Sequence, residues 1–158
     1  MKKATVFLTS LLIIVAVVGC NKKGQRPADL PDDMTPCVIT VTQEGQPVEG
    51  ATVAFEYETP VKYATSSNAS NEKGEAIMVT YGFPGAQQGK AKVVIKKLVT
   101  EGGGDSEEYG EAGSIGQDFN TIDPKYGSVD TTDLTIEIGK ENVAQTFDVG
   151  PAVHIPVK

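Results

Sequence analysis

Apolar and polar residues alternate in short runs along most of the chain, and turn residues separate these runs. In the first run, Cys37, Ile39 and Val41 share one face, while threonines occupy the other. This period of two is typical of β-strands with one buried side, and no stretch shows sustained helical spacing. We therefore expect an all-β domain, a seven-stranded β-sandwich. Its predicted strands are 37–42, 51–57, 63–66, 76–80, 90–98, 134–138 and 145–149.

Glycine-rich segments connect several of these strands. The segment 71–74 ends in Gly74, which we expect to supply the positive φ of a tight turn. The segment 81–89, which contains three glycines and Pro84, is predicted to be a loop. Residues 99–118 combine a triple glycine with acidic side chains and little apolar content, so they are predicted to be a mobile excursion.

The N-terminal segment has the pattern of a bacterial secretion signal. Lys2 and Lys3 precede an uncharged stretch, residues 6–18, that is shorter than the roughly 20 residues of a spanning helix. The stretch ends in Val17-Val18-Gly19-Cys20, which resembles the lipobox of bacterial lipoproteins. This resemblance implies a lipid thioether on Cys20, cleavage before it and acylation of its amine. The alternative is an ordinary secretion signal that contains a cysteine.

The domain organisation follows from these signals. We expect a signal peptide at 1–19, and a lipidated cysteine with a flexible, proline-containing tether at 20–36. The β-domain is predicted at 37–150 and a C-terminal tail at 151–158. Removal of 19 of the 158 residues leaves 139, which is enough for one ordinary domain.

The charge of the chain restricts its partners. The part from Cys20 onward has 12 basic and 21 acidic residues, because two of the 14 basic residues precede it, and its formal charge is −9. Such a domain repels nucleic acid and anionic headgroups. Attachment to a membrane is therefore expected through the N-terminal lipid and not through a basic surface.

Cysteine is used sparingly. With Cys20 alkylated, Cys37 has no partner in the chain, so an intramolecular disulfide is excluded. We expect Cys37 to be a buried free thiol in the first strand; a reactive or intermolecular thiol is the alternative.

Several motifs resemble the carboxypeptidase regulatory-like domain. They are Gly45-Gln46-Pro47-Val48-Glu49-Gly50-Ala51, then Asn71-Glu72-Lys73-Gly74-Glu75, then Pro84-Gly85 before the strand that contains Val93-Val94-Ile95. The resemblance implies a transthyretin-like sandwich. The closing part, from Asp123-Pro124 to the last strand, is similar to small lipoproteins of planctomycete-type bacteria that carry this domain. Relatives of this kind are accessory or binding modules.

The residues offer little catalytic chemistry. The single histidine, His154, lies in the tail and cannot alone form a catalytic triad or a histidine-rich metal site. We therefore expect no enzymatic activity and no cofactor. Acidic loop residues are weak candidates for calcium, but no EF-hand spacing is present and they also serve solubility. These candidates are Asp105, Glu107, Glu108 and Glu111.

The leading hypothesis is a non-enzymatic, membrane-anchored lipoprotein that acts as a structural or binding module of the bacterial cell envelope. Asn21 is not the aspartate that retains many lipoproteins at the inner membrane, so the outer membrane is favoured. The alternative is an accessory protein that binds carbohydrate or peptide, or an envelope protein, through the loop aromatics Tyr81, Phe83 and Tyr126. A calcium-dependent adhesion module is a third possibility.

Overall fold

The computed structural model describes residues 26–102 and 116–157. Cys20, its lipobox and the four calcium candidates Asp105, Glu107, Glu108 and Glu111 lie outside the described residues. The described elements are strands and one short 3-10 helix, so the fold is all-β, as the alternation predicts.

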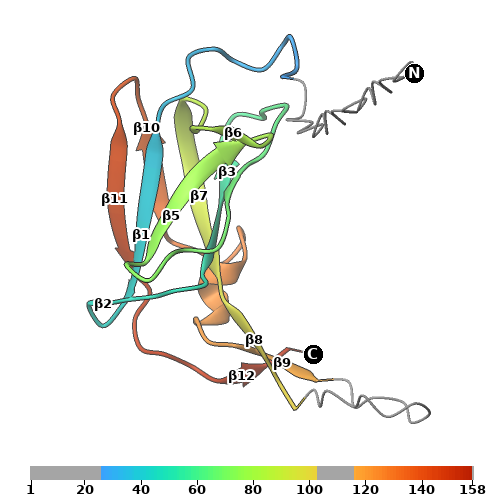
Figure 1. Cartoon of the computed structure of the whole chain (residues 1–158), viewed down its shortest axis with the longest axis vertical. Coiled ribbons are helices and arrows are strands. Elements are labelled where there is room, and N and C mark those ends of the chain that lie inside the picture. The colour runs from blue at the N-terminus through green and yellow to red at the C-terminus, as the bar shows by residue number, and fades with distance from the viewer. Residues whose placement is uncertain (1–25, 103–115, 158) are drawn as a thin grey trace, which may run out of the picture.

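The strands form one large curled sheet and one small sheet (Figure 1). The large sheet has the order β10-β7-β3-β4-β5-β1-β11, with short strands β2 and β6 paired to β1 and β5. All of its pairs are antiparallel except β1 with β11. Its strands are β1 (Cys37–Gln43), β2 (Gln46–Pro47), β3 (Thr52–Tyr57), β4 (Thr65–Ser67), β5 (Glu75–Thr80), β6 (Phe83–Pro84), β7 (Gly89–Lys96), β10 (Thr135–Ile138) and β11 (Val143–Asp148).

The predicted alternation places one hydrophobic core inside the curl. In β1, Cys37, Ile39 and Val41 are buried, and Val38 and Thr40 on the other face are half-buried. The same pattern recurs in the inward residues of β3, β5, β7, β10 and β11. Burial of each such aliphatic side chain stabilises the fold by about 1.5–3 kcal/mol. All seven predicted strands are present, with shifted ends.

Two tight hairpins have the same backbone conformation. Glu44 and Gly45 join β1 to β2 with φ of 50° and 78°. Tyr81 and Gly82 join β5 to β6 with φ of 50° and 79°. Positive φ at both central residues is the pattern of a type I′ turn, whose twist matches the flanking strands. The predicted loop 81–89 therefore begins with a hairpin.

Gly74 has the positive φ that its position predicts, 76°. Its backbone also lies against β1, where an added Cβ would be 2.5 Å from the Val41 carbonyl oxygen. The Gly74 carbonyl accepts a hydrogen bond from the Val41 amide at 2.9 Å. Glycine is therefore required here by both conformation and space.

The expected tether differs from the structure between residues 26 and 36. Leu30 is only 3% exposed, and Thr35 is 2% exposed. Thr35 and Ala86 exchange two backbone hydrogen bonds, at 2.9 and 2.8 Å. This segment therefore packs on the domain. The buried Leu30 side chain and the backbone pairing of Thr35 hold it in place, although the segment has no periodic hydrophobic pattern.

The small sheet is formed by segments that were predicted to be an excursion and a tail. It has the order β12-β9-β8, from β8 (Leu98–Glu101), β9 (Gln117–Asn120) and β12 (Ile155–Pro156). Residues 98–101 and 117–120 are thus paired strands, and β12 joins the edge of β9. Figure 1 shows this sheet at the opposite end of the domain from β6.

Candidate interaction surface

The most exposed tyrosine of the described residues lies at the tip of the β5–β6 hairpin. Tyr81 occupies the first turn position with φ of 50°, and it is 59% exposed. Bulky residues seldom adopt this left-handed conformation, which is better suited to Asn or Gly. Residues in such sparsely populated conformations cluster at functional sites, so the exposed Tyr81 ring is a candidate for contact with a ligand or partner.

A second tyrosine lies beside Tyr81. The Tyr63 and Tyr81 ring centroids are 5.1 Å apart, with a tilt of 59° between the planes. The Tyr63 hydroxyl donates to Asp29 Oδ1 at 2.6 Å, and its carbonyl accepts from Gln87 Nε2 at 2.6 Å. Tyr63 is thereby held between the hairpin and the N-terminal segment.

Asp29 also forms an ion pair with Lys62. The hydrogen bonds from Lys62 and then from Tyr63 lower the pKa of Asp29. In return, Asp29 raises the pKa of Lys62. The Lys62 Nζ atom also lies 5.3 Å from the centre of the Tyr63 ring, a favourable cation–π geometry.

Arg26 extends this surface toward Phe83. Its guanidinium carbon lies 5.4 Å from the Phe83 ring centre, and the group donates to the Pro31 carbonyl at 2.6 Å. It also pairs with Asp32 at 3.1 Å. Two groups of contacting side chains, one at Phe83 and one at Tyr63, therefore lie on the β5–β6 hairpin and the segments beside it, and together they form one surface region at this end of the domain. We call it the tyrosine patch, and its members are Arg26, Asp29, Lys62, Tyr63, Tyr81 and Phe83.

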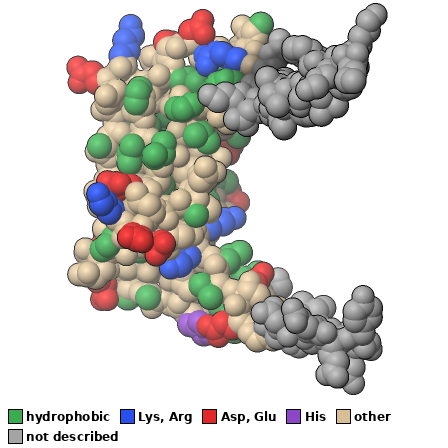
Figure 2. All heavy atoms as spheres, viewed as in Figure 1, with side chains coloured by type: hydrophobic (Ala, Val, Ile, Leu, Met, Phe, Trp, Pro, Cys, Tyr) green, Lys and Arg blue, Asp and Glu red, His purple; other side chains and the backbone are tan. Residues whose placement is uncertain are grey.

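Figure 2 shows acidic, basic and hydrophobic side chains mixed at the end of the domain where β6 lies. Both described basic groups of the patch have an acidic partner, Asp32 for Arg26 and Asp29 for Lys62. The patch thus combines exposed aromatic rings with paired charges.

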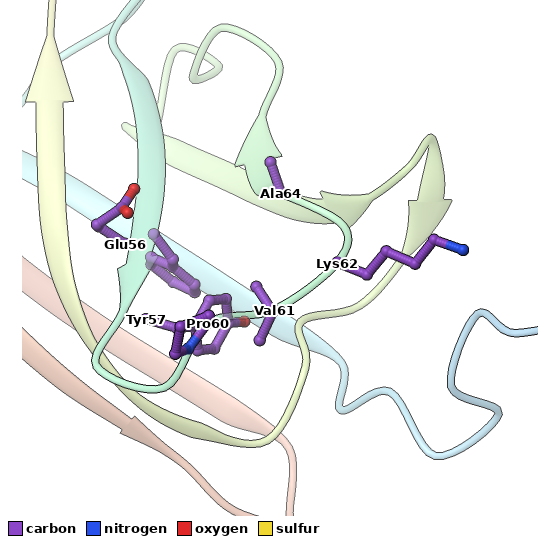
Figure 3. A pocket seen from close by; sticks show the side chains of 7 residues that line it. Glu56, Tyr57, Pro60, Val61, Lys62 and Ala64 are labelled. Carbon is purple, nitrogen blue, oxygen red and sulfur yellow. The ribbon is translucent and has the colours of Figure 1, made fainter.

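A shallow cavity of about 360 Å³ adjoins the patch, between β3 and the loop that carries Lys62. Tyr57, Pro60 and Val61 line it (Figure 3). The Lys62 side chain extends away from these residues in Figure 3. The Tyr57 hydroxyl is already bonded, to the Gln87 carbonyl at 3.0 Å and to the Thr65 hydroxyl at 3.1 Å. The lining of the cavity is therefore mixed, because apolar side chains lie beside Glu56 and the hydroxyl of Tyr57 is already paired.

Tyr126 does not join Tyr81 and Phe83. It lies in the 3-10 helix η1 (Pro124–Gly127), is 8% exposed, and has the Lys125 Nζ atom 4.4 Å from its ring centre. Figure 1 shows η1 near the end of β7 away from β6. Of the three proposed ligand-contacting aromatics, Tyr81 and Phe83 belong to one hairpin, and Tyr126 packs against the core.

Sequence reasoning did not select Tyr63, Lys62 or Arg26 for this surface. The alternation predicts Tyr63 inside a strand, 63–66, whereas β4 begins at Thr65 and leaves Tyr63 in the preceding loop. The sequence did contain a local signal: Tyr63 closely follows Pro60, binding residues concentrate on loops, and tyrosine is enriched at interfaces. Their aromatic partners lie far along the chain, 18 positions away for Tyr63 with Tyr81 and 57 for Arg26 with Phe83, and could not be inferred from spacing.

His154 lies in contact with the small sheet, apart from the tyrosine patch. His154 stacks on Phe119, with ring centroids 4.0 Å apart, and its Nε2 lies 3.7 Å from a Glu101 carboxylate oxygen. Within 26–102 and 116–157, no three His, Cys, Asp or Glu side chains gather as a metal site requires. In the same ranges, no helix has the length and apolar character needed to cross a bilayer.

Comparisons with models of protein families, with curated proteins and with solved structures give no significant match for this chain. Its function must therefore be argued from its own residues.

Proposed function

We propose that this chain is a non-enzymatic lipoprotein, anchored by lipid on Cys20 and acting as a structural or binding module of the bacterial cell envelope. The observation that carries the proposal is the sequence Val17-Val18-Gly19-Cys20 directly after an uncharged apolar stretch. The described domain begins soon after this cysteine, at Arg26. A lipid at Cys20 would thus lie close to the folded part of the chain.

The proposal includes a transthyretin-like sandwich of the carboxypeptidase regulatory-like type. Three features support this finer assignment: the short strand β4 bridges β3 and β5, a single core lies inside the curl, and Gly74 lies in the turn where the motif has it. Modules of this type are accessory domains, so the assignment agrees with a structural or binding role. Fold resemblance alone assigns no chemistry.

The cellular location follows from the anchor. A formal charge of −9 from Cys20 onward makes electrostatic attachment to anionic lipid unfavourable, so acyl chains provide the attachment. Asn21 after the cysteine favours the outer membrane over the inner one. The same charge argues against nucleic acid as a partner.

The test is metabolic labelling with a palmitate analogue in a bacterial host. The wild-type chain should take up label and float with membranes, while Cys20→Ser should take up none and be soluble or uncleaved. Cys37→Ser is the matched control, because it changes the other cysteine and should label like the wild type. Equal labelling of wild type and Cys20→Ser would overturn the lipid anchor.

A second candidate function is recognition of a glycan or peptide by the tyrosine patch. The observation in its favour is the exposed Tyr81 ring beside Tyr63, with the Asp29 carboxylate and Lys62 ammonium at its border. Aromatic rings stack on sugar rings, and charged groups orient hydroxyls or peptide groups. Soluble peptidoglycan fragments are a suitable probe. Tyr81→Ser should weaken binding about tenfold, the effect of losing about 1.4 kcal/mol, and Ile77→Ser should not.

Calcium-dependent adhesion through Asp105, Glu107, Glu108 and Glu111 remains a third proposal. A calcium titration monitored by calorimetry tests it. Replacement of Glu107 and Glu108 by Gln should then abolish the heat of binding, whereas a response unchanged by these substitutions would exclude this acidic segment.

A further inference from the structure

We propose that the tyrosine patch faces the membrane and that Tyr81 lies in its headgroup region. This inference rests on the proposed lipid at Cys20 and adds an orientation and a contact surface. The partner of the tyrosine patch is the surface of the bilayer that holds the anchor.

The first argument is the short distance between anchor and domain. The chain from residue 26 onward belongs to the domain, because Leu30 is buried and Thr35 exchanges backbone hydrogen bonds with Ala86. Arg26 is tied to the same segment through the Pro31 carbonyl. Arg26 is only six positions after Cys20, and a fully extended chain spans about 3.3–3.6 Å per residue. Arg26 is therefore within about 20 Å of the lipid anchor.

This limit on the distance between Arg26 and the lipid determines which end of the domain faces the membrane. Arg26 lies over Phe83, and Phe83 follows the hairpin tip that carries Tyr81. Figure 1 shows the described chain beginning at this end, with the small sheet at the other end. An anchor held so close brings the tyrosine patch to the bilayer and directs the small sheet away from it.

The second argument is the chemistry of the patch. Tyr81 is 59% exposed, and Val61 beside Lys62 is 37% exposed. Tyrosine prefers the boundary between apolar and polar regions of a membrane, because its ring is apolar and its hydroxyl is polar. Arg26 and Lys62 can place their aliphatic stems along the boundary with their charges in the headgroup layer.

The third argument is electrostatic. The chain from Cys20 onward has a net charge of −9, so most of its surface is repelled by anionic headgroups. At the patch, Arg26 is paired with Asp32 and Lys62 with Asp29, which reduces the local net charge. Two further carboxylates lie nearby: Asp33 accepts a hydrogen bond from Gln88 Nε2 at 3.1 Å, and Glu56 lines the cavity next to Lys62. The two ion pairs therefore make this end less strongly repelled by anionic headgroups than a surface of unpaired carboxylates.

The backbone conformation of Tyr81 supports a contact between its ring and the membrane. A type I′ turn favours Asn-Gly, yet this turn contains Tyr81-Gly82. The conformational cost of tyrosine at positive φ is explained if the ring has an external partner. The equivalent β1–β2 turn, at the other end of β1 from the N-terminal segment, has the polar residue Glu44 in the same conformation.

The experiment uses the absence of tryptophan from the whole sequence. Tyr81→Trp introduces a single fluorescent probe into the patch. The matched control is Ile77→Trp on the outer face of β5, since Ile77 is 61% exposed. Both variants, lipidated and cleaved before Cys20, are reconstituted into phosphatidylcholine vesicles that contain lipids brominated near the headgroup. We expect bromine to quench the probe at position 81 at least about twofold more than the probe at 77, because Tyr81 lies at the interface.

The outcomes separate this inference from the proposed function. Vesicle-bound protein with equal quenching at both positions, or with stronger quenching at 77, overturns the orientation and leaves the anchor intact. Absence of vesicle binding together with equal palmitate labelling of wild type and Cys20→Ser overturns the anchor itself. Circular dichroism and urea unfolding of both tryptophan variants check that each is folded. Aqueous iodide supplies the reciprocal measurement, since it should quench the probe at 77 more strongly than the probe at 81.

Discussion

The Gly45 amide donates a hydrogen bond of 2.8 Å to Asp148 Oδ2, although the two residues are 103 positions apart. Asp148 also accepts from the Thr42 hydroxyl at 3.0 Å and from the Gly150 amide at 2.9 Å. The parallel pairing of β1 with β11, which places Thr42 beside Asp148, brings these groups together. One carboxylate thus ties the first hairpin to the last long strand.

Replacement of Asp148 should change the response of the fold to acid. Its hydrogen bonds, that from Gly45 first, lower the pKa of Asp148 below its usual value. A group with a lowered folded pKa stabilises the protein above its unfolded pKa of about 4, and this contribution is lost as pH falls through the folded pKa. We expect Asp148→Asn to unfold at lower urea concentration than wild type at pH 7. The difference should shrink below pH 4.

The control for this pH profile is Asp130→Asn in an exposed turn, which should follow the wild type. A constant difference between Asp148→Asn and wild type from pH 7 to pH 3 would show that shape, and not charge, makes the contribution of Asp148.

Two glycines with equal φ should respond differently to alanine. Gly45 and Gly74 have φ of 78° and 76°, but an added Cβ meets open space at Gly45 and the Val41 carbonyl oxygen at Gly74. Gly45→Ala should lower the free energy of unfolding by about 1 kcal/mol through backbone strain alone. Gly74→Ala should lower it by more than about 3 kcal/mol. Urea denaturation of both variants measures the difference, and similar values would contradict the close approach at Gly74.

The β1–β2 turn should accept a better turn residue. Glu44 has φ of 50°, a conformation in which Asn is favoured over Glu. We expect Glu44→Asn to raise the free energy of unfolding by roughly 0.5–1 kcal/mol. Glu44→Ala is the control, because it shortens the side chain without that preference. A gain of equal size in both variants would point to removal of charge as the cause.

Cys37 should behave as an unreactive buried thiol. It is 2% exposed, and burial raises its pKa to about 11. Because the thiolate is the nucleophile, iodoacetamide at pH 8 should leave the native protein unmodified. In denaturant, the lipidated protein should take up one equivalent, at Cys37. Rapid modification of the folded protein, detected by mass spectrometry, would contradict the burial of this side chain.

The sequence by itself determined seven of the strands and the turn at Gly74. Alternation places Cys37, Ile39 and Val41 on one face whatever their partners are, because successive side chains of a strand point to opposite sides. The turn at Gly74 could also be predicted, because few residues other than glycine accept its φ of 76°. These are local properties of the backbone, and short segments contain the information for them.

Only the tertiary structure decided which segments meet. Leu30 is buried, Tyr126 is buried and Tyr63 lies against Tyr81, yet none of these outcomes follows from the neighbours of each residue. The β8–β9–β12 sheet likewise pairs segments with weak strand patterns, whose backbone groups are satisfied by one another. Such contacts depend on the three-dimensional arrangement of distant strands. Periodicity reports which side of a strand is apolar, but it contains no information on the strand or segment that covers that side.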